Sequence, residues 1–287
     1  MKRRHWIALS ILTAIAVTFI ATARWRREPS YEGKRLSGWV RDLQGTSAPS
    51  RRRAEEAIRG MGTNALPGLK KALHAEDTAL KVTVVRFLRR FGIVRVRVLL
   101  AREWRTRAAL ACGALGTLGS PAIPDLLEMC KNDSLSYNIP ASAMGQMGEN
   151  AVEPLTVALT NPDRNVRRVA AVALGYIGPP ARPAVPALIK CLQDEDIDVC
   201  VNASQALGVI GIGSPEVVKT LIEALAHPDS VVRCNAAGSL ASLGKSAEAA
   251  VPALLKLLHD TDEVVRSDAT NALQRISPEN AAKAGVK

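Results

Sequence analysis

Residues 163–177 read DRNVRRVAAVALGYI, and the chain repeats this pattern three more times at a fixed interval of 33 residues. Each copy begins with an aspartate, carries a valine three positions later and a leucine eight positions after that. The four aspartates are Asp163, Asp196, Asp229 and Asp262. A period of this length is typical of stacked helical hairpins, because one hairpin is too small to bury its apolar face alone. The repeat therefore predicts an all-α fold in which hairpins stack as a solenoid.

One copy shows why each unit is a pair of helices. Apolar residues recur at three- and four-residue steps, which places them on one face of a helix. These residues are Val166, Ala170, Ala173, Leu174 and Ile177. This helix is the second of the two helices in each unit. Asp163 can cap its first turn, and Gly178 with two following prolines can end it. A first helix precedes the cap and is clearest in Val251–His259, where Pro252 suits the first helical position.

Two repeated features indicate close contact between neighbouring hairpins. Gly175 and Gly208 share one repeat position inside the second helix, where glycine costs roughly 1 kcal/mol against alanine, so tight packing is the expected compensation. Arginines recur beside the aspartates at Arg167, Arg233 and Arg266. Because the aspartates and arginines recur from repeat to repeat, we expect a structural hydrogen-bonded ladder rather than a catalytic role. Cys200 stands where the next arginine is expected and interrupts this ladder.

The pattern Asp-x-x-Val-Arg-x-x-Ala-Ala-x-Ala-Leu-Gly-x-Ile-Gly, followed by Val-Pro-Ala-Leu, resembles the bacterial HEAT-like repeats of the phycobilisome-lyase type. The resemblance covers roughly residues 51–276 and is strong from 105 onward. It implies an α-solenoid of about seven to eight stacked HEAT-like hairpins. Cys200 and Ala241 depart from the motif. The motif is specific for fold but not for function, since such repeats serve as scaffolds, adaptors and occasional enzymes.

Residues 1–27 differ in kind from the rest. Basic residues flank an uncharged apolar run, Ile7–Ala23, which as a helix would be about 26 Å long, close to a hydrocarbon core. Trp6 and Trp25 bracket this run, which favours a retained signal anchor in the membrane. A single-pass membrane protein with its repeats outside the cytoplasm is then expected. Alternatively, cleavage at a small-x-small site near Ala23 would leave an exported soluble protein.

Two further segments flank the repeats. Residues 28–50 read as a lead-in and N-terminal cap, in which Trp39 is expected to pack on the first hairpin because a solenoid end exposes apolar surface. The stretch 31–40 resembles the lead-in of membrane-attached or exported bacterial HEAT-repeat proteins. Residues 277–287 are expected to form a small frayed C-terminal tail.

Charge is distributed unevenly along the chain. Residues 1–107 contain 24 Lys or Arg and 8 Asp or Glu, whereas residues 108–287 contain 14 and 19. Three arginines fall at helical steps on one face of a helix and could contact an anionic membrane surface. These are Arg86, Arg89 and Arg90. No nucleic-acid-binding signature accompanies the basic excess, so no nucleic-acid partner is expected.

The sequence contains no recognisable catalytic motif and no cofactor is expected. There is no Gly-rich phosphate loop and no Gly-x-Ser-x-Gly elbow. The five cysteines show no C-x-x-C spacing and are interpreted as small buried hydrophobes. His227 and His259, with neighbouring aspartates, could form a weak metal site, although exposed helix-end histidines are the plainer interpretation. A bilin-lyase-like enzyme or assembly factor acting on a protein remains the alternative function.

The function favoured by the sequence is a non-catalytic scaffold or adaptor that binds another protein or peptide. Second helices normally line the concave face of such stacks, and amide side chains there can both donate and accept hydrogen bonds. The side chains expected on this face are Arg168, Tyr176, Asn202, Gln205, Asn235, Asp268 and Asn271. A merely solvated helix face is the competing interpretation.

Overall fold

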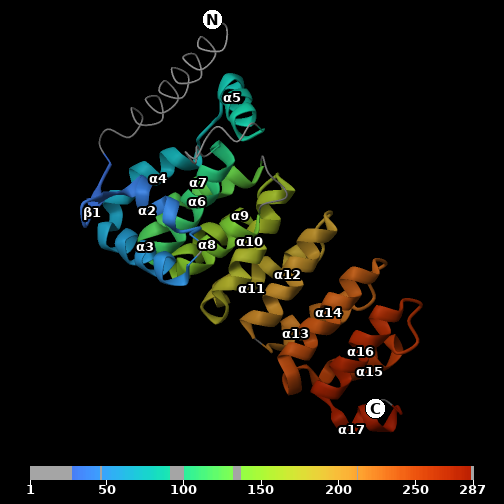
Figure 1. Ribbon diagram of the computed structural model, residues 1–287. Helices are drawn as coiled ribbons and strands as arrows, with labels where there is room; N and C mark the ends of the chain where they lie inside the picture. The colour runs from blue at the N-terminus through green and yellow to red at the C-terminus, as the bar shows by residue number, and fades with distance from the viewer. Residues whose placement is uncertain (1–27, 46, 91–99, 132–136, 212, 286–287) are drawn as a thin grey trace, which may run out of the picture. The chain divides into compact units, whose positions relative to one another are not determined.

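The computed structural model describes residues 28–45, 47–90, 100–131, 137–211 and 213–285 (Figure 1). These residues are helical except for turns and one short β-hairpin, which confirms the all-α prediction. Their contacts divide the chain into two compact units, one up to Leu115 and one from Gly116. Each unit is described separately below.

The N-terminal unit begins with a hairpin that the sequence did not predict. Strands β1 (Ser30–Tyr31) and β2 (Lys34–Arg35) pair antiparallel and lead into helix α2 (Leu36–Asp42). Trp39 of α2 is only 6% exposed, and its Nε1 donates to the Tyr31 carbonyl at 3.1 Å. Helix α2 packs on α3 (Ala48–Met61), so the lead-in covers the apolar side of the first repeat helix.

The next hairpin contains an insertion. The 3₁₀ segment η1 (Gly62–Ala65) leads from α3 into α4 (Leu66–Leu73), and α4 packs extensively on α6 (Ala101–Ala114). Helix α5 (Ala79–Arg90) lies between these two in sequence. Asp77 Oδ2 accepts from the Ala101 amide at 2.7 Å and joins the two sides of the insertion directly. The helix pair of this repeat is therefore α4 with α6, and not α4 with α5.

The second unit is a regular stack of first and second helices. Its first helices are α7 (Ile123–Lys131), α9 (Val152–Ala158), α11 (Val185–Cys191), α13 (Pro215–Ala224) and α15 (Val251–Leu257). Its second helices are α8 (Asn138–Gln146), α10 (Arg164–Ile177), α12 (Ile197–Ile210), α14 (Ser230–Leu243) and α16 (Glu263–Ile276). Short 3₁₀ segments lead into most of the first helices, namely η2 (Gly116–Ala122), η3 (Gly148–Ala151), η4 (Pro179–Ala184) and η5 (Gly244–Ala250). Each second helix packs on the next, and Figure 1 shows α10, α12, α14 and α16 side by side in that order.

The predicted helix boundaries are confirmed in all four copies of the repeat. Each aspartate adopts the extended N-cap conformation, and its carboxylate accepts from a free amide of the first turn. Asp163, for example, accepts from the Asn165 amide at 2.8 Å. Gly178 ends α10 with a φ of +71°, a conformation that costs glycine little because it has no Cβ.

The glycines inside the second helices lie where neighbouring backbones approach closely, as predicted. A Cβ on Gly208 would lie 3.0 Å from the Cα of Ser239 in the next second helix. A Cβ on Gly175 would lie 3.4 Å from the Cα of Ala206. The two glycines therefore let α10, α12 and α14 pack at short range, which offsets their poor helix propensity.

The C-terminal segment is more ordered than predicted. Instead of fraying after α16, the chain forms helix α17 (Pro278–Lys283), whose Ala281 is 2% exposed. The Ser277 hydroxyl donates to Glu248 at 3.0 Å, and Asn280 donates to Ser277 at 2.9 Å. A polar pair at the turn, together with burial of one alanine, holds this short helix against α16.

The prediction of a single-pass membrane protein is not supported and is corrected here. In the part of the chain that the structure describes, no helix is both long and apolar enough to cross a membrane. The apolar run that prompted the prediction falls within residues 1–27, which lie outside the described residues. Hydropathy and flanking tryptophans suggested a span, but the described helices are short and have exposed polar faces.

Candidate functional site

The predicted binding residues lie along four adjacent second helices. They are Arg168 and Tyr176 on α10, Asn202 and Gln205 on α12, Asn235 on α14, and Asp268 and Asn271 on α16. Tyr176 is 57% exposed, and Gln205 and Asn271 are also exposed, whereas the side chains of the others are partly covered. Because α10, α12, α14 and α16 pack in order, these residues share one continuous surface, which we call the second-helix face.

Hydrogen bonds fix the amides at the centre of the second-helix face. Gln205 Nε2 donates to Asn235 Oδ1 at 2.6 Å and joins α12 to α14. Asn202 donates to the Asp198 carbonyl at 2.6 Å, and Asn235 donates to the Val231 carbonyl at 2.8 Å. Within the described residues, Gln205 Oε1 and Asn202 Oδ1 accept no hydrogen bond, so both remain available to a partner.

The side chain of Arg168 packs against neighbouring side chains and does not project from the second-helix face. Its guanidinium lies over the ring of Tyr137, with 4.3 Å between Cζ and the ring centroid, and Nη1 donates to Asp198 at 3.1 Å. Only 13% of its side chain is exposed. Arg168 thus links α8, α10 and α12, and its own charge is largely compensated within the stack.

The structure adds exposed apolar residues that the sequence reasoning did not single out. Val209 on α12 is 58% exposed, Val231 on α14 is 52% exposed and Val264 on α16 is 61% exposed. Val209 follows Tyr176 by one period of 33 residues, and Val264 follows Val231 by the same step. The repeat register, applied to exposed helical positions as well as to the core, could have found them.

A second polar system, the arginine ladder, joins the hairpins at the capped ends of the helices. Arg167 is 8% exposed, and its Nε and Nη2 donate to the two oxygens of Asp194, both at 2.8 Å. Arg233 holds Asp260 in the same way at 2.9 and 2.8 Å. The prediction of arginine rungs is therefore right, but the acid partner was misplaced. It lies two residues before the capping aspartate of the next repeat.

The ladder has a gap between α12 and α14, where both partners change together. Cys200 replaces the arginine, and its thiol donates to the Asp194 carbonyl at 3.2 Å. His227 stands where the acid would be, and its Nδ1 accepts from the Asp229 amide at 3.1 Å. Ser204 and Ser239 instead form a buried hydrogen bond of 3.0 Å between these helices. The junction without an ion pair is thus joined by hydroxyls and by the close approach at Gly208.

The arginine ladder predicts that the difference in thermal stability between the wild type and Arg233→Gln depends on pH. The hydrogen bonds from Arg233 hold the pKa of Asp260 below its ordinary value of 3.8. A lowered folded-state pKa contributes stability above the unfolded value, and this contribution is lost as the pH falls through the folded value. We expect Arg233→Gln to lower Tm at about pH 6, and the gap to wild type to narrow at about pH 2.5.

Thermal unfolding of both proteins, followed by circular dichroism, checks this expectation. Some difference in Tm between wild type and Arg233→Gln should remain at acid pH, because Arg233 also donates to the carbonyls of His227 and Pro228, both at 2.9 Å. A gap that stays constant across the acid range would show that the Asp260 charge contributes nothing to folding.

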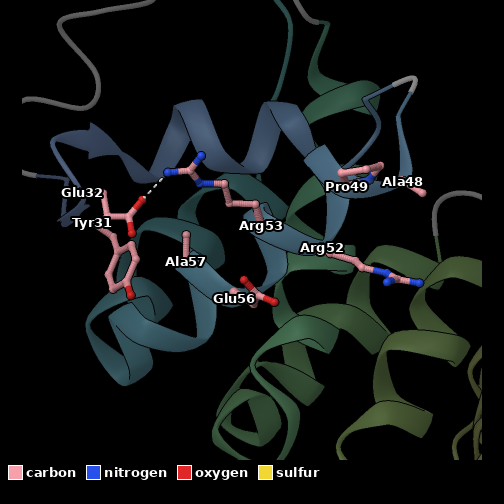
Figure 2. Close-up of a pocket in the computed structure, with 8 residues that line it drawn as sticks. All are labelled: Tyr31, Glu32, Ala48, Pro49, Arg52, Arg53, Glu56 and Ala57. Carbon is pink, nitrogen blue, oxygen red and sulfur yellow. Dashed lines mark hydrogen bonds and ion pairs between the residues drawn. The ribbon is translucent and has the colours of Figure 1, made fainter.

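A pocket of about 500 Å³ lies in the N-terminal unit, between the β-hairpin and the start of α3 (Figure 2). Arg53 spans it to pair with Glu32 at 2.9 Å, and the Tyr31 ring forms one wall. Within the described residues, neither Arg52 nor Glu56 forms an ion pair. Because the pocket offers both charges side by side, it shows no preference for a cationic or an anionic ligand.

The basic residues predicted to meet an anionic surface lie on α5. Arg86 is exposed, while the side chains of Arg89 and Arg90 lie outside the described residues. The structure therefore provides no test of a shared basic face on this helix.

Comparison with known families agrees with this architecture. The family model for HEAT repeats matches residues 140–199 and 185–274, and the model for the PBS lyase HEAT-like repeat matches residues 104–132. The matched segments include the ladder, the second-helix face and the regular stack of the second unit. The chain is thus an α-solenoid that contains HEAT repeats.

Individual proteins resemble this chain over a short segment or at low sequence identity. The uncharacterized protein SkfG of Bacillus subtilis (strain 168) is 37% identical over 78 residues, which are 26% of this chain and 46% of that protein. The match thus spans about half of the curated relative. Among solved structures, Kap121p is similar with a TM-score of 0.51 and 15% identity, over 84% of this chain and 33% of that one. This similarity concerns the fold alone.

A similarity to the CpcE–CpcF complex of phycocyanin lyase from Nostoc sp. PCC7120 is weaker. It has a TM-score of 0.47 and 22% identity, and covers 53% of this chain and 98% of that one. At this level of structural agreement it supports no argument about activity.

Proposed function

We propose that this protein is a non-catalytic adaptor that binds another protein through the second-helix face. The observation that carries the proposal is the combination of exposed apolar side chains with fixed amides on one continuous surface. Tyr176, Val209, Val231 and Val264 are each more than half exposed, although the same helices bury most of their other apolar residues. Apolar anchors surrounded by polar groups are typical of protein-binding surfaces.

The anchors follow a diagonal across the face. Tyr176 and Val209 lie near the C-terminal ends of α10 and α12, while Val231 and Val264 lie near the N-terminal ends of α14 and α16. The Gln205–Asn235 pair lies between these two sets. A partner crossing the four helices would therefore meet apolar contacts at both ends and amide hydrogen bonds at the centre. This arrangement fits an extended segment or one edge of a folded protein.

The state of the cysteines favours binding over covalent chemistry. Burial raises the pKa of the Cys191 thiol to about 11, and burial with the nearby Asp268 raises that of Cys234 to about 11. Burial also raises the pKa of Cys200. Because the thiolate is the nucleophile, thiols held protonated at neutral pH are poorly suited to a lyase-like transfer.

A protein partner is also in keeping with the use of similar folds. Kap121p has been crystallised bound to Nup53p, and that structure is similar to this chain with a TM-score of 0.50 and 13% identity. A protein with a similar fold can thus bind another protein, and experiment is to identify the partner of this chain.

The test uses three valines of similar exposure. A partner captured by the full chain should lose about tenfold or more in affinity with Val209→Asp combined with Val264→Asp, because a buried unpaired carboxylate replaces an apolar contact. Val157→Asp is the matched control, since Val157 is 68% exposed but lies on first helix α9. Equal loss with the control, or none with the double variant, would remove the second-helix face from the binding mechanism.

A further inference from the structure

One glycine on the second-helix face is not explained by the packing of its own helix. Gly238 lies in the interior of α14 and is exposed. It does not belong to the glycines with a positive φ, so its backbone conformation suits any residue. Apart from proline, glycine is the least favourable residue in a helix interior, because it loses the most backbone freedom on folding. Gly238 therefore weakens α14 without a gain inside the helix.

Contact between repeats does not account for Gly238 either. Gly175 and Gly208 are needed because the next second helix would lie 3.4 and 3.0 Å from their Cβ atoms. Their counterpart in α14 is Ala241, one period after Gly208. Among the described residues, no atom outside the helix around Gly238 lies within 4 Å of a Cβ built on it. The remaining physical reason for such a glycine is close approach by the backbone of another molecule.

Gly238 lies at the centre of the second-helix face. It follows Gln205 by one period and precedes Asn271 by one period, so the three residues share one repeat position on α12, α14 and α16. Gln205 and Asn271 are both exposed. Gly238 therefore forms a gap between two amide side chains, which we call the Gly238 notch. The Ser242 hydroxyl, one turn further along α14, donates to the Gly238 carbonyl at 3.0 Å.

The groups around the Gly238 notch match a peptide main chain. The repeat position that contains it is uncharged in all four second helices, where it is occupied by Val172, Gln205, Gly238 and Asn271. Each residue of a main chain is also uncharged and offers one donor and one acceptor. Amide side chains can pair with both. A large apolar side chain in the notch would instead cover amides without giving them hydrogen bonds, which is unfavourable.

The length of the second-helix face also suits an extended segment. Packed helices lie about 8–10 Å apart, so four of them span about 24–30 Å. An extended chain rises about 3.3 Å per residue, and about eight or nine residues cover this distance. Side chains alternate along such a segment, so some can contact the exposed valines while the main chain passes the notch.

We propose that Gly238 determines which partner the second-helix face accepts, namely an extended segment whose main chain crosses α14 in contact with Gly238. Gln205 and Asn271 form hydrogen bonds to the main chain of the segment on either side of this contact. This inference rests on the proposed function and narrows its partner from any protein surface to an extended peptide.

The experiment begins with a displayed library of random peptides of about twelve residues, somewhat longer than the face. Peptides are selected on the full chain, and those that lose binding to the Val209→Asp, Val264→Asp double variant are kept and synthesised. We expect Gly238→Ala to bind these peptides about tenfold more weakly, because the added methyl group holds the main chain away from its hydrogen-bond partners.

The same substitution should make the protein more stable. Alanine fits the open space at position 238 and favours the helix, so Tm should rise by about 2 °C. Weaker binding by a more stable protein cannot come from a folding defect. Gly208→Ala should lower Tm, because its Cβ meets the backbone of Ser239. Lys219→Ala, at an exposed position on first helix α13, should leave the affinity unchanged.

N-methylation of single peptide bonds tests the main-chain contact itself. It removes one N–H donor and adds bulk to the main chain, so methylation near the middle of the peptide should weaken binding about tenfold. Peptides that tolerate a methyl group at every bond would overturn the proposal. Equal affinity of wild type and Gly238→Ala, or a lower Tm of Gly238→Ala, would also overturn it.

A library that yields no peptide dependent on Val209 and Val264 would overturn the extended segment as well. That result would leave the adaptor function standing for a folded partner. The proposed function fails separately, if the double variant does not weaken binding of a captured protein partner.

Discussion

Leu207→Asp is expected to destabilise the stack by roughly 4 kcal/mol or more, because it places a carboxylate among apolar side chains without a partner. Leu207 is 1% exposed and lies in α12, where the face toward α14 is closely packed. Each repeat depends on its neighbours to cover its apolar side, so loss of packing should spread from α12 to adjacent hairpins. Hydrogen exchange followed by mass spectrometry measures this spread directly.

The matched control is Val209→Asp, two residues further along the same helix. Val209 is 58% exposed, so the new carboxylate stays hydrated. The free energy of unfolding should therefore change by about 0.5 kcal/mol or less. Exchange that increases in α12 alone after Leu207→Asp would contradict the coupling between repeats. Equal destabilisation by the two substitutions would contradict the assignment of Leu207 to the core.

Arg167→Gln is the second change expected to have a large effect, of roughly 3–5 kcal/mol. Asp194 is 11% exposed at its side chain and would lose both charge-assisted hydrogen bonds, leaving a nearly buried carboxylate without its partner. The carbonyls of Asn161 and Pro162 would also lose their donor. Urea denaturation of the variant and the wild type measures the difference.

Arg266→Gln isolates the contribution of the carboxylate. This substitution removes the same two carbonyl bonds but no described ion pair, so its effect should be distinctly smaller. Similar losses for the two variants would show that the carbonyl bonds, and not the link from Arg167 to Asp194, join the repeats.

The 33-residue period was enough to predict the stack, the helix starts and the close approaches. These features depend on local chemistry, namely a carboxylate at the N-cap, a glycine at a stop and a small residue at a contact. Each recurs at a fixed place, so one copy predicts the others. Asp163, Gly178 and Gly208 are therefore found where the pattern put them.

Other features depend on contacts between repeats, which a single copy does not contain. The acid of each rung is 27 residues from its arginine, so the pairing of Arg167 with Asp194 could not be read from local spacing. The joint change to Cys200 and His227 has the same origin. Helix α5 has a sound amphipathic pattern of its own, although α4 packs on α6 instead, so local periodicity does not reveal the insertion.

The candidate binding surface was predicted in part. Periodicity placed Gln205 and Asn271 on the exposed side of the second helices, where the structure also has them. It did not anticipate that Arg168 would be drawn against Tyr137 and Asp198, because that contact joins three helices. The exposed valines were missed because apolar residues were sought only in the core.

Site-specific photo-crosslinking tests the central claim, that the second-helix face binds a protein, most directly. A benzophenone amino acid would replace exposed Gln205 on α12 or exposed Asn271 on α16, and exposed Lys219 on α13 would be the control. The account predicts that the first two positions give a crosslink to the same single protein in the native cells, and that Lys219 gives none. The same product from Lys219, or different products from Gln205 and Asn271, would contradict it.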